Sequence, residues 1–238
     1  MMLAAAAAAA WSTYLHWLPC RGAMLSASIL HGYAYGPDFS DACLRRMDTG
    51  TPIPFPPEPA EVTSRAAELG IVATVLLGLA TLVVVLGLRL QARLKALALL
   101  PGLATLVVAG VAISALRDPA RNPDGYLSLW LWIANEAAAV VVVVVLYRTA
   151  ALVEPLRLVV LLWGTTATGL VHTMGEYAAM TLFSDANWDT PPGTGHLTVA
   201  VVVLAAVLTV IMTLSTRADR DPRGTSASAQ TTERAVHT

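Results

Sequence analysis

Residues 69–88 read LGIVATVLLGLATLVVVLGL and contain no charged side chain. A helix needs about 20 consecutive apolar residues to cross the hydrocarbon core of a bilayer, and this segment has that length. Four more segments have similar length and apolar character: residues 96–116, 125–147, 158–183 and 197–215. The sequence therefore predicts an all-α membrane protein built as a helical bundle.

The composition of the whole chain supports this class. Of the 238 residues, 56% are hydrophobic and 13% are charged, and the formal net charge is −1. Soluble domains usually carry about 25% charged residues, so the low charge content excludes an ordinary soluble enzyme and a disordered chain. A net charge near zero argues against a nucleic-acid binder. Arginine supplies 14 of the 15 basic residues and alanine is abundant, which indicates a GC-rich bacterial gene.

Residues 3–19 form a sixth candidate span, which is short and rich in alanine. The segment has neither the basic n-region nor the cleavage site of a secretory signal peptide. Residues 17–19, Trp-Leu-Pro, make a poor lipobox before Cys20, which argues against a lipoprotein. We therefore expect an uncleaved first helix and six spans, with a cleaved signal and five spans as the alternative.

The basic residues predict the orientation of the bundle. They gather after residues 69–88, before residues 158–183, and in the C-terminal tail. Positively charged loops favour the cytoplasmic side of the membrane. Six spans then place both termini in the cytoplasm and residues 20–64 on the extracytoplasmic side. The basic residues concerned are Arg89, Arg93, Lys95, Arg148, Arg157, Arg217, Arg220, Arg223 and Arg234.

This topology divides the chain into four parts, which are residues 1–19, 20–64, 65–215 and 216–238. The first is a transmembrane helix or signal anchor, and the third is a five-helix transmembrane core. The second is an extracytoplasmic loop that contains both cysteines, and an oxidising compartment favours a disulfide between Cys20 and Cys43. Its proline-rich stretch, TPIPFPPEP, predicts a stiff strut. The fourth part is polar and is expected to be a disordered cytoplasmic tail.

One heptapeptide, GLATLVV, occurs twice, at residues 78–84 and 102–108. The chain is strongly biased toward alanine, leucine and valine, so we interpret the repetition as chance. A transporter built from inverted repeats would need a longer correspondence.

Two ionisable side chains are expected at the same depth in the bilayer. Glu136 lies eleven residues after the start of its span at residue 125, and His172 lies eleven residues before the end of its span at residue 183. At about 1.5 Å per residue, both lie roughly 16 Å below the outer surface. The two spans are joined by a short connection and are expected to be neighbours. We therefore predict a contact between His172 and Glu136.

Further polar residues extend this candidate site. Thr168, His172 and Glu176 recur at helical spacing and share one helix face, which should point into the bundle. Asn135, beside Glu136, adds another partner. One interpretation is a structural clamp between helices, in which such contacts are worth about 0.6 to 2 kcal/mol. The other is a proton or ion site, since ionisable residues inside a membrane are functional candidates by default.

Metal and haem sites have weaker support. His16, His172 and His196 all fall in the outer half and could ligate a metal or a haem, but no local ligand spacing supports this. Residues 185–189 begin like a calcium loop and then depart from the pattern, because position 12 is His196 instead of Glu. The three matching residues are Asp185, Asn187 and Asp189. We therefore expect no cofactor and keep a haem or a metal ion as an alternative.

The sequence contains no serine-hydrolase, nucleotide-binding or zinc-protease motif. The favoured hypothesis is a non-enzymatic accessory or assembly component of a bacterial cytoplasmic-membrane complex. Its partners would be the lipid bilayer and either another membrane protein or a second copy of the chain. The first alternative is a small proton- or ion-coupled transporter that uses Glu136, His172 and Glu176. The second is a haem- or metal-binding redox protein.

Overall fold

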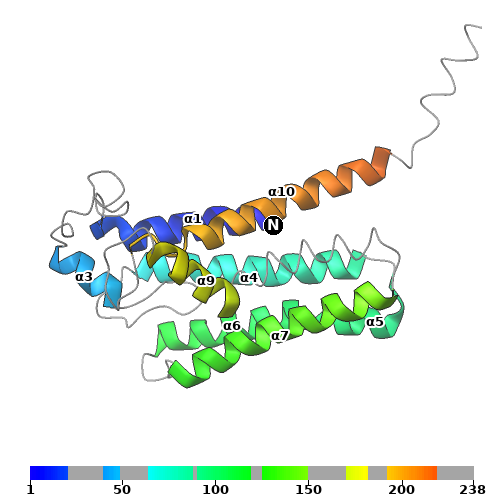
Figure 1. Ribbon diagram of the computed structural model, residues 1–238, viewed down its shortest axis with the longest axis horizontal. Helices are drawn as coiled ribbons and strands as arrows, with labels where there is room; N and C mark the ends of the chain where they lie inside the picture. Colours follow the sequence, from blue (N-terminus) through cyan, green and yellow to red (C-terminus); the bar gives the residue numbers. More distant parts are fainter. Residues whose placement is uncertain are drawn as a thin grey trace, which may run out of the picture.

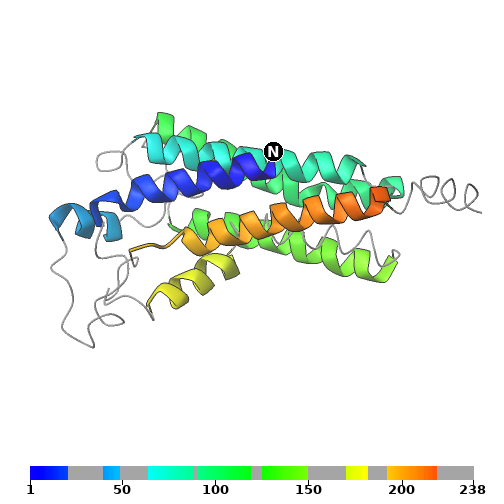
Figure 2. The ribbon, with the colours of Figure 1, turned by 90° about the horizontal axis from the view of Figure 1, so that it is seen from above.

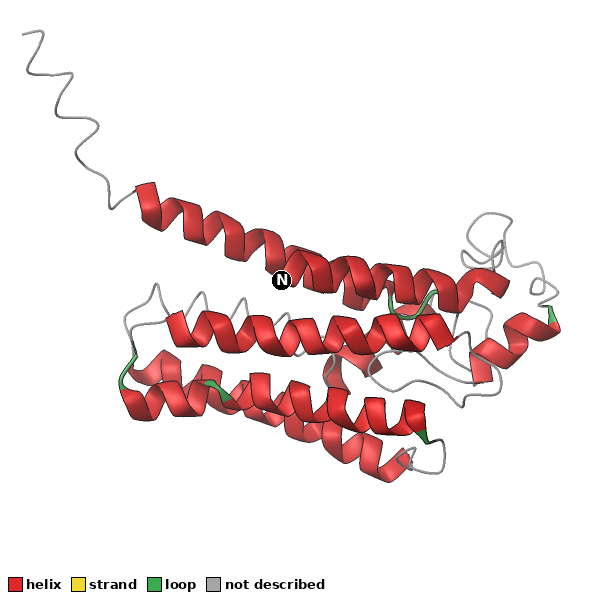
Figure 3. Ribbon diagram, turned by 180° about the vertical axis from the view of Figure 1, so that it is seen from behind, coloured by secondary structure: helices red, strands yellow, loops and turns green. Residues whose placement is uncertain are grey.

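The computed structural model is all-helical in the part of the chain that it describes (Figures 1 and 3). Within those residues there is no strand. The helices are α1 (Met2–Trp17), η1 (Leu18–Cys20), α3 (Asp41–Asp48), α4 (Ser64–Gly87), α5 (Ala92–Ala98), α6 (Leu100–Arg117), α7 (Gly125–Thr149), α9 (Leu170–Thr181) and α10 (His196–Ala218). The described residues are 1–20, 40–48, 64–87, 90–118, 125–149, 170–181 and 192–218.

Two helical stretches of the described residues are long and apolar enough to cross a membrane. They are Arg65–Gly87 within α4 and Ala92–Arg117, which runs through α5 and α6. Two shorter apolar stretches, Ile133–Val144 and His196–Ile211, belong to α7 and α10. The all-helical class is thus confirmed, and the count of six spans stays a prediction. The proline-rich residues 51–59 and the tail from residue 219 lie outside the described residues.

The long helices run side by side along the longest axis of the molecule (Figures 1 and 2). The short helix α3 lies at one end of this bundle, and α5 lies at the other (Figure 1). We refer to these as the α3 end and the α5 end. Among the described residues, α6 packs against both α4 and α7.

Helix α1 packs between α4 and α10 and runs antiparallel to both. Near its start, Met2 clusters with Ala80 and Ala206. Two turns later, Ala8 clusters with Ala73, which lies earlier in α4. Alanine side chains are short, so they allow the backbones of neighbouring helices to approach closely. The alanine run of α1 therefore acts as an interior surface, with its buried members at Ala5, Ala6, Ala8 and Ala9.

The two GLATLVV copies contact each other where α4 crosses α6. A Cβ atom added to Gly78 would lie 2.9 Å from the Leu106 side chain, and one added to Gly102 would lie 2.8 Å from the Leu82 side chain. The contact is reciprocal, because each leucine is four residues after the glycine of its own copy. Each glycine therefore makes room for the other copy. Interpreting the repeat as chance missed this packing role.

The threonines of the two copies also make the same local hydrogen bond. Thr81 and Thr105 are both fully buried. Each hydroxyl donates to the carbonyl four residues earlier, at Leu77 and Pro101, over 2.9 Å. This local bond satisfies a polar group that an apolar interior would otherwise leave without a partner. Identical sequence thus takes identical local structure on the two helices.

Candidate functional site

The buried carboxylate of Glu176 connects α9 to the beginning of α10. Only 2% of this residue is exposed. Its Oε1 accepts hydrogen bonds from the backbone N–H groups of Gly195 and Leu197, the latter at 2.8 Å. Its Oε2 accepts from the backbone N–H of Thr198 at 3.2 Å and from the Thr198 hydroxyl. Both oxygen atoms are therefore engaged by α10 and the residue just before it.

This arrangement has a clear physical reason. The first N–H groups of any helix lack partners within that helix. They also carry the positive end of the helix dipole, so an anion at this position is stabilised. Glu176 supplies that anion from a different helix. Chemically it acts as a cap for α10 that simultaneously attaches α9 to it.

A tight turn brings the start of α10 against α1. Residues 192–195 are buried, and Gly193 and Gly195 have φ angles of 94° and 106°. Residues with a Cβ rarely adopt such angles, which explains the two glycines. A Cβ on Gly195 would also lie 3.0 Å from the side chain of Thr13 on α1. The turn therefore depends on glycine both for its backbone shape and for its contact with α1.

Polar side chains of α1 complete this junction. The indole N–H of Trp17, which is fully buried, donates to the Thr194 carbonyl over 2.7 Å. The Ser12 hydroxyl donates to the Ala66 carbonyl of α4 over 2.6 Å. The ring of His16 lies edge-on to that of Trp17, with ring centres 4.6 Å apart. We call Thr13, Trp17, Glu176, Thr194 and Gly195 the helix junction.

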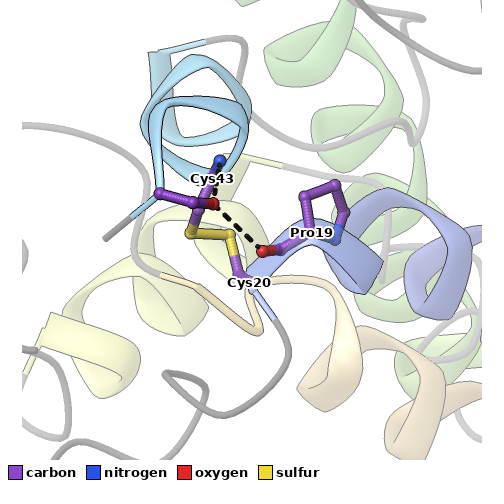
Figure 4. Close-up of a disulfide and its surroundings, with 4 residues drawn as sticks. Pro19, Cys20 and Cys43 are labelled. Carbon is purple, nitrogen blue, oxygen red and sulfur yellow. Dashed lines mark hydrogen bonds between the residues drawn. A yellow bond between two sulfur atoms is a disulfide. The ribbon is translucent and has the colours of Figure 1, made fainter. Parts of the chain in front are cut away.

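A disulfide lies next to the helix junction at the α3 end (Figure 4). The sulfur atoms of Cys20 and Cys43 are bonded, and their Cα atoms are 4.8 Å apart. Both cysteines are buried and cluster with Trp17 and Met47. The Ser40 hydroxyl contacts the Pro19 carbonyl at 3.4 Å and accepts from the Cys43 N–H at 3.2 Å. The geometry is compatible with the expected pairing and attaches α3 to the end of α1.

The second buried polar residue of the candidate site, Asn135, holds a different pair of helices. It is 2% exposed on α7, and its Oδ1 lies 3.2 Å from the Thr105 hydroxyl of α6. That hydroxyl also contacts the Pro101 carbonyl, so its single proton is shared between two acceptors. Asn135 therefore links α7 to α6, whereas Glu176 links α9 to α10.

The remaining members of the candidate site are only partly described. Glu136 is half-buried on α7. The backbone of His172 belongs to α9, but its side chain lies outside the described residues, and so does all of Thr168. The contact expected between His172 and Glu136 therefore stays a prediction. The described contacts give Asn135 and Glu176 separate structural partners.

Candidate metal ligands do not form a cluster in the described part of the chain. There, no group of three or more His, Cys, Asp and Glu side chains is placed to hold a metal ion. His16 is buried beside Trp17, whereas His196 is exposed and its Nδ1 contacts the Gly193 carbonyl at 2.6 Å. The three residues that resembled a calcium loop lie outside the described residues, namely Asp185, Asn187 and Asp189.

Sequence reasoning identified Glu176 but missed the residues that it binds. The signal available was Pro-Pro-Gly-Thr-Gly at residues 191–195, since glycine pairs before a helix often mark a turn with positive φ. A second signal was the cluster of polar side chains near the end of the first helix, including Ser12, Thr13 and His16. Neither signal indicates which residue on another helix the side chain binds.

The chain was compared with known proteins to ask whether this junction has a precedent. No protein-family model, curated protein sequence or solved structure matches it. The features of the chain that bear on its function are therefore its buried polar contacts and its exposed apolar side chains.

Proposed function

We propose that this chain is a six-span protein of the bacterial cytoplasmic membrane and acts as a non-enzymatic structural subunit of a larger membrane complex. The α3 end would face outward and the α5 end would face the cytoplasm. The observation that carries the proposal is the cap that Glu176 forms on α10. A buried carboxylate in a membrane span suggests transport chemistry by default. Here its hydrogen bonds instead hold α9, α10 and the adjoining turn together.

The surface of the described helices supports the membrane location. Large apolar side chains are exposed on α1, α4, α6, α7 and α10. Soluble monomers rarely expose contiguous apolar patches larger than a few hundred Å². Lipid covers such side chains without cost, while interior positions use small residues such as alanine and glycine for close packing. Exposed examples are Leu3, Val83, Leu86, Val107, Val140, Ile211 and Leu214.

The structural role is supported by how the buried polar groups are used. Glu176 and Asn135 each connect two helices through hydrogen bonds. A transport site needs groups that exchange partners as substrate binds and leaves. Three of the four hydrogen bonds that Glu176 accepts come from backbone N–H groups, which a helix N-terminus presents permanently. Such a site stabilises one arrangement of helices, as expected of a scaffold that positions a partner.

Topology and partnership are tested separately. For topology, Thr51→Cys and Thr231→Cys are introduced singly into a chain whose native cysteines are replaced by serine. An impermeant maleimide should label position 51 in intact cells and position 231 only after the membrane is opened. Labelling of both positions in intact cells would contradict the proposed orientation.

For partnership, native membranes are extracted in a mild detergent and the particle is sized. The chain alone has a mass of 25.0 kDa. We expect it in a larger particle with a second protein at fixed stoichiometry. Recovery of the chain by itself under several mild detergents would argue against a subunit role. The same sample is checked for absorbance and metals, because a haem or a metal at near-unit amount would support a redox protein instead.

A further inference from the structure

An apolar groove lies beside the beginning of α1. Its volume is about 290 Å³, and it is bordered by α4 on one side and α10 on the other. Figures 1 and 2 show both helices continuing toward the α5 end, past the first residues of α1. The side chains that line it include Met1, Leu3, Val83, Val84, Ala206 and Val210. The groove is therefore an apolar depression on the surface of the bundle.

The single polar side chain among the groove-lining residues is already satisfied. Thr209 donates its hydroxyl to the Ala205 carbonyl over 2.7 Å. An apolar occupant would thus leave this hydroxyl bonded, and the other side chains that line the groove are apolar. Val83, which is 57% exposed, presents its side chain to whatever fills the groove.

The Lys95 side chain, which comes from α5, lies at the end of α4, the helix that forms one wall of the groove. The Lys95 ammonium donates to the carbonyl of Leu86 over 3.2 Å. Leu86 is one helical turn beyond Val83, so the charge lies close to the line of the groove. An ammonium has three N–H donors, and this hydrogen bond uses one of them. The others can bind phosphate oxygens from the cytoplasmic surface of the membrane.

We propose that this groove binds one acyl chain of an anionic phospholipid from the cytoplasmic leaflet, with its phosphate near Lys95. The apolar lining matches the acyl chain, and the charge at the end of α4 matches the headgroup. This inference rests on the membrane location proposed above. It adds a specific lipid site to a protein otherwise surrounded by bulk lipid.

The test uses the full chain, purified in detergent and stripped of lipid. Dioleoyl phosphatidylglycerol or dioleoyl phosphatidylcholine is added, and native mass spectrometry counts the lipids retained per chain. We expect one phosphatidylglycerol bound about fivefold more tightly than phosphatidylcholine, the difference that one lysine near a headgroup supplies. Lys95→Gln should abolish this preference. Arg117→Gln, which removes a charge at the other end of the bundle, should not.

The repeat provides a matched control for the groove itself. Val83 and Val107 occupy the same position in the two GLATLVV copies and are 57% and 56% exposed, but Val107 does not line the groove. Val83→Trp should fill the groove and abolish the retained lipid, whereas Val107→Trp should keep it. Circular dichroism confirms that both variants are folded.

Three results would overturn the inference. They are the absence of retained lipid on the unmodified chain, equal loss in both tryptophan variants, and a doubled protein mass with no lipid, which would identify a second copy as the occupant. Carbonate extraction of cell membranes separates this from the proposed function. A chain that stays in the membrane pellet but retains no lipid contradicts the lipid site alone.

Discussion

The two halves of α1 are held in the bundle by different kinds of interaction. The half near Met2 packs through alanines between α4 and α10 and has an apolar groove beside it. The half near Trp17 is held by directed hydrogen bonds, a glycine turn and the neighbouring disulfide. Close apolar packing holds the first half in place. The directed hydrogen bonds of the second half allow only one arrangement of the neighbouring helices. The helix junction is therefore the part of the molecule in which one side-chain change should have the largest effect.

The largest expected effect follows from removing the cap on α10. Glu176→Ala should lower the free energy of unfolding by about 4 kcal/mol, because one buried and three partly buried donors lose their partner at once. The measurement is denaturant unfolding in mixed micelles. Glu68→Ala is the control, since that carboxylate is exposed on α4 and should change stability by less than about 0.5 kcal/mol. Equal losses of stability in the Glu176→Ala and Glu68→Ala variants would show that the cap on α10 does not stabilise the helix junction.

The disulfide should rank second. Replacing Cys20 and Cys43 by serine should cost about 3 kcal/mol, in line with other disulfides that close loops of similar size. The intact chain should weigh two hydrogen atoms less than its reduced form and should take up no alkylating reagent before reduction. Two reactive thiols in the native protein would contradict the bridge.

The packing of the α1 half near Met2 is tested by placing a larger side chain at a buried and at an exposed alanine. Ala5 is fully buried and Ala7 is exposed on the same helix. Ala5→Leu should destabilise by about 2 kcal/mol through overpacking. Ala7→Leu should stay within about 0.5 kcal/mol of the original chain, because it adds a side chain at an exposed position. If both changes were equally tolerated, close packing would not hold this half.

The smallest effect is expected at Glu136, outside both halves. If the protein is a scaffold, Glu136→Gln in proteoliposomes should leave the decay of an imposed proton gradient unchanged. A transporter would lose a flux that the original chain shows, while remaining folded. That outcome would favour the proton or ion site suggested by Glu136, His172 and Glu176.

The match between sequence and structure differs from segment to segment. The uncharged run at residues 69–88 predicted a helix that the structure places at Ser64–Gly87, because an apolar run of that length has few other stable forms. Glu176 was identified as a buried polar residue because an ionisable side chain inside an apolar helix is expected to point into the bundle. Its partners were not identified, because the glycine pair before α10 indicates a turn but does not indicate which helix packs against that turn.

The sequence by itself determined the helical class, the approximate positions of α4, α6, α7 and α10, and the residue types that need internal partners. These properties depend on local composition and on the cost of burying polar groups without hydrogen bonds. Only the tertiary structure decided which helices meet. In the tertiary structure, the two copies of the repeat contact each other through Gly78 and Gly102, and the Glu176 carboxylate caps α10. Such pairings depend on how helices cross in space, which no single segment encodes.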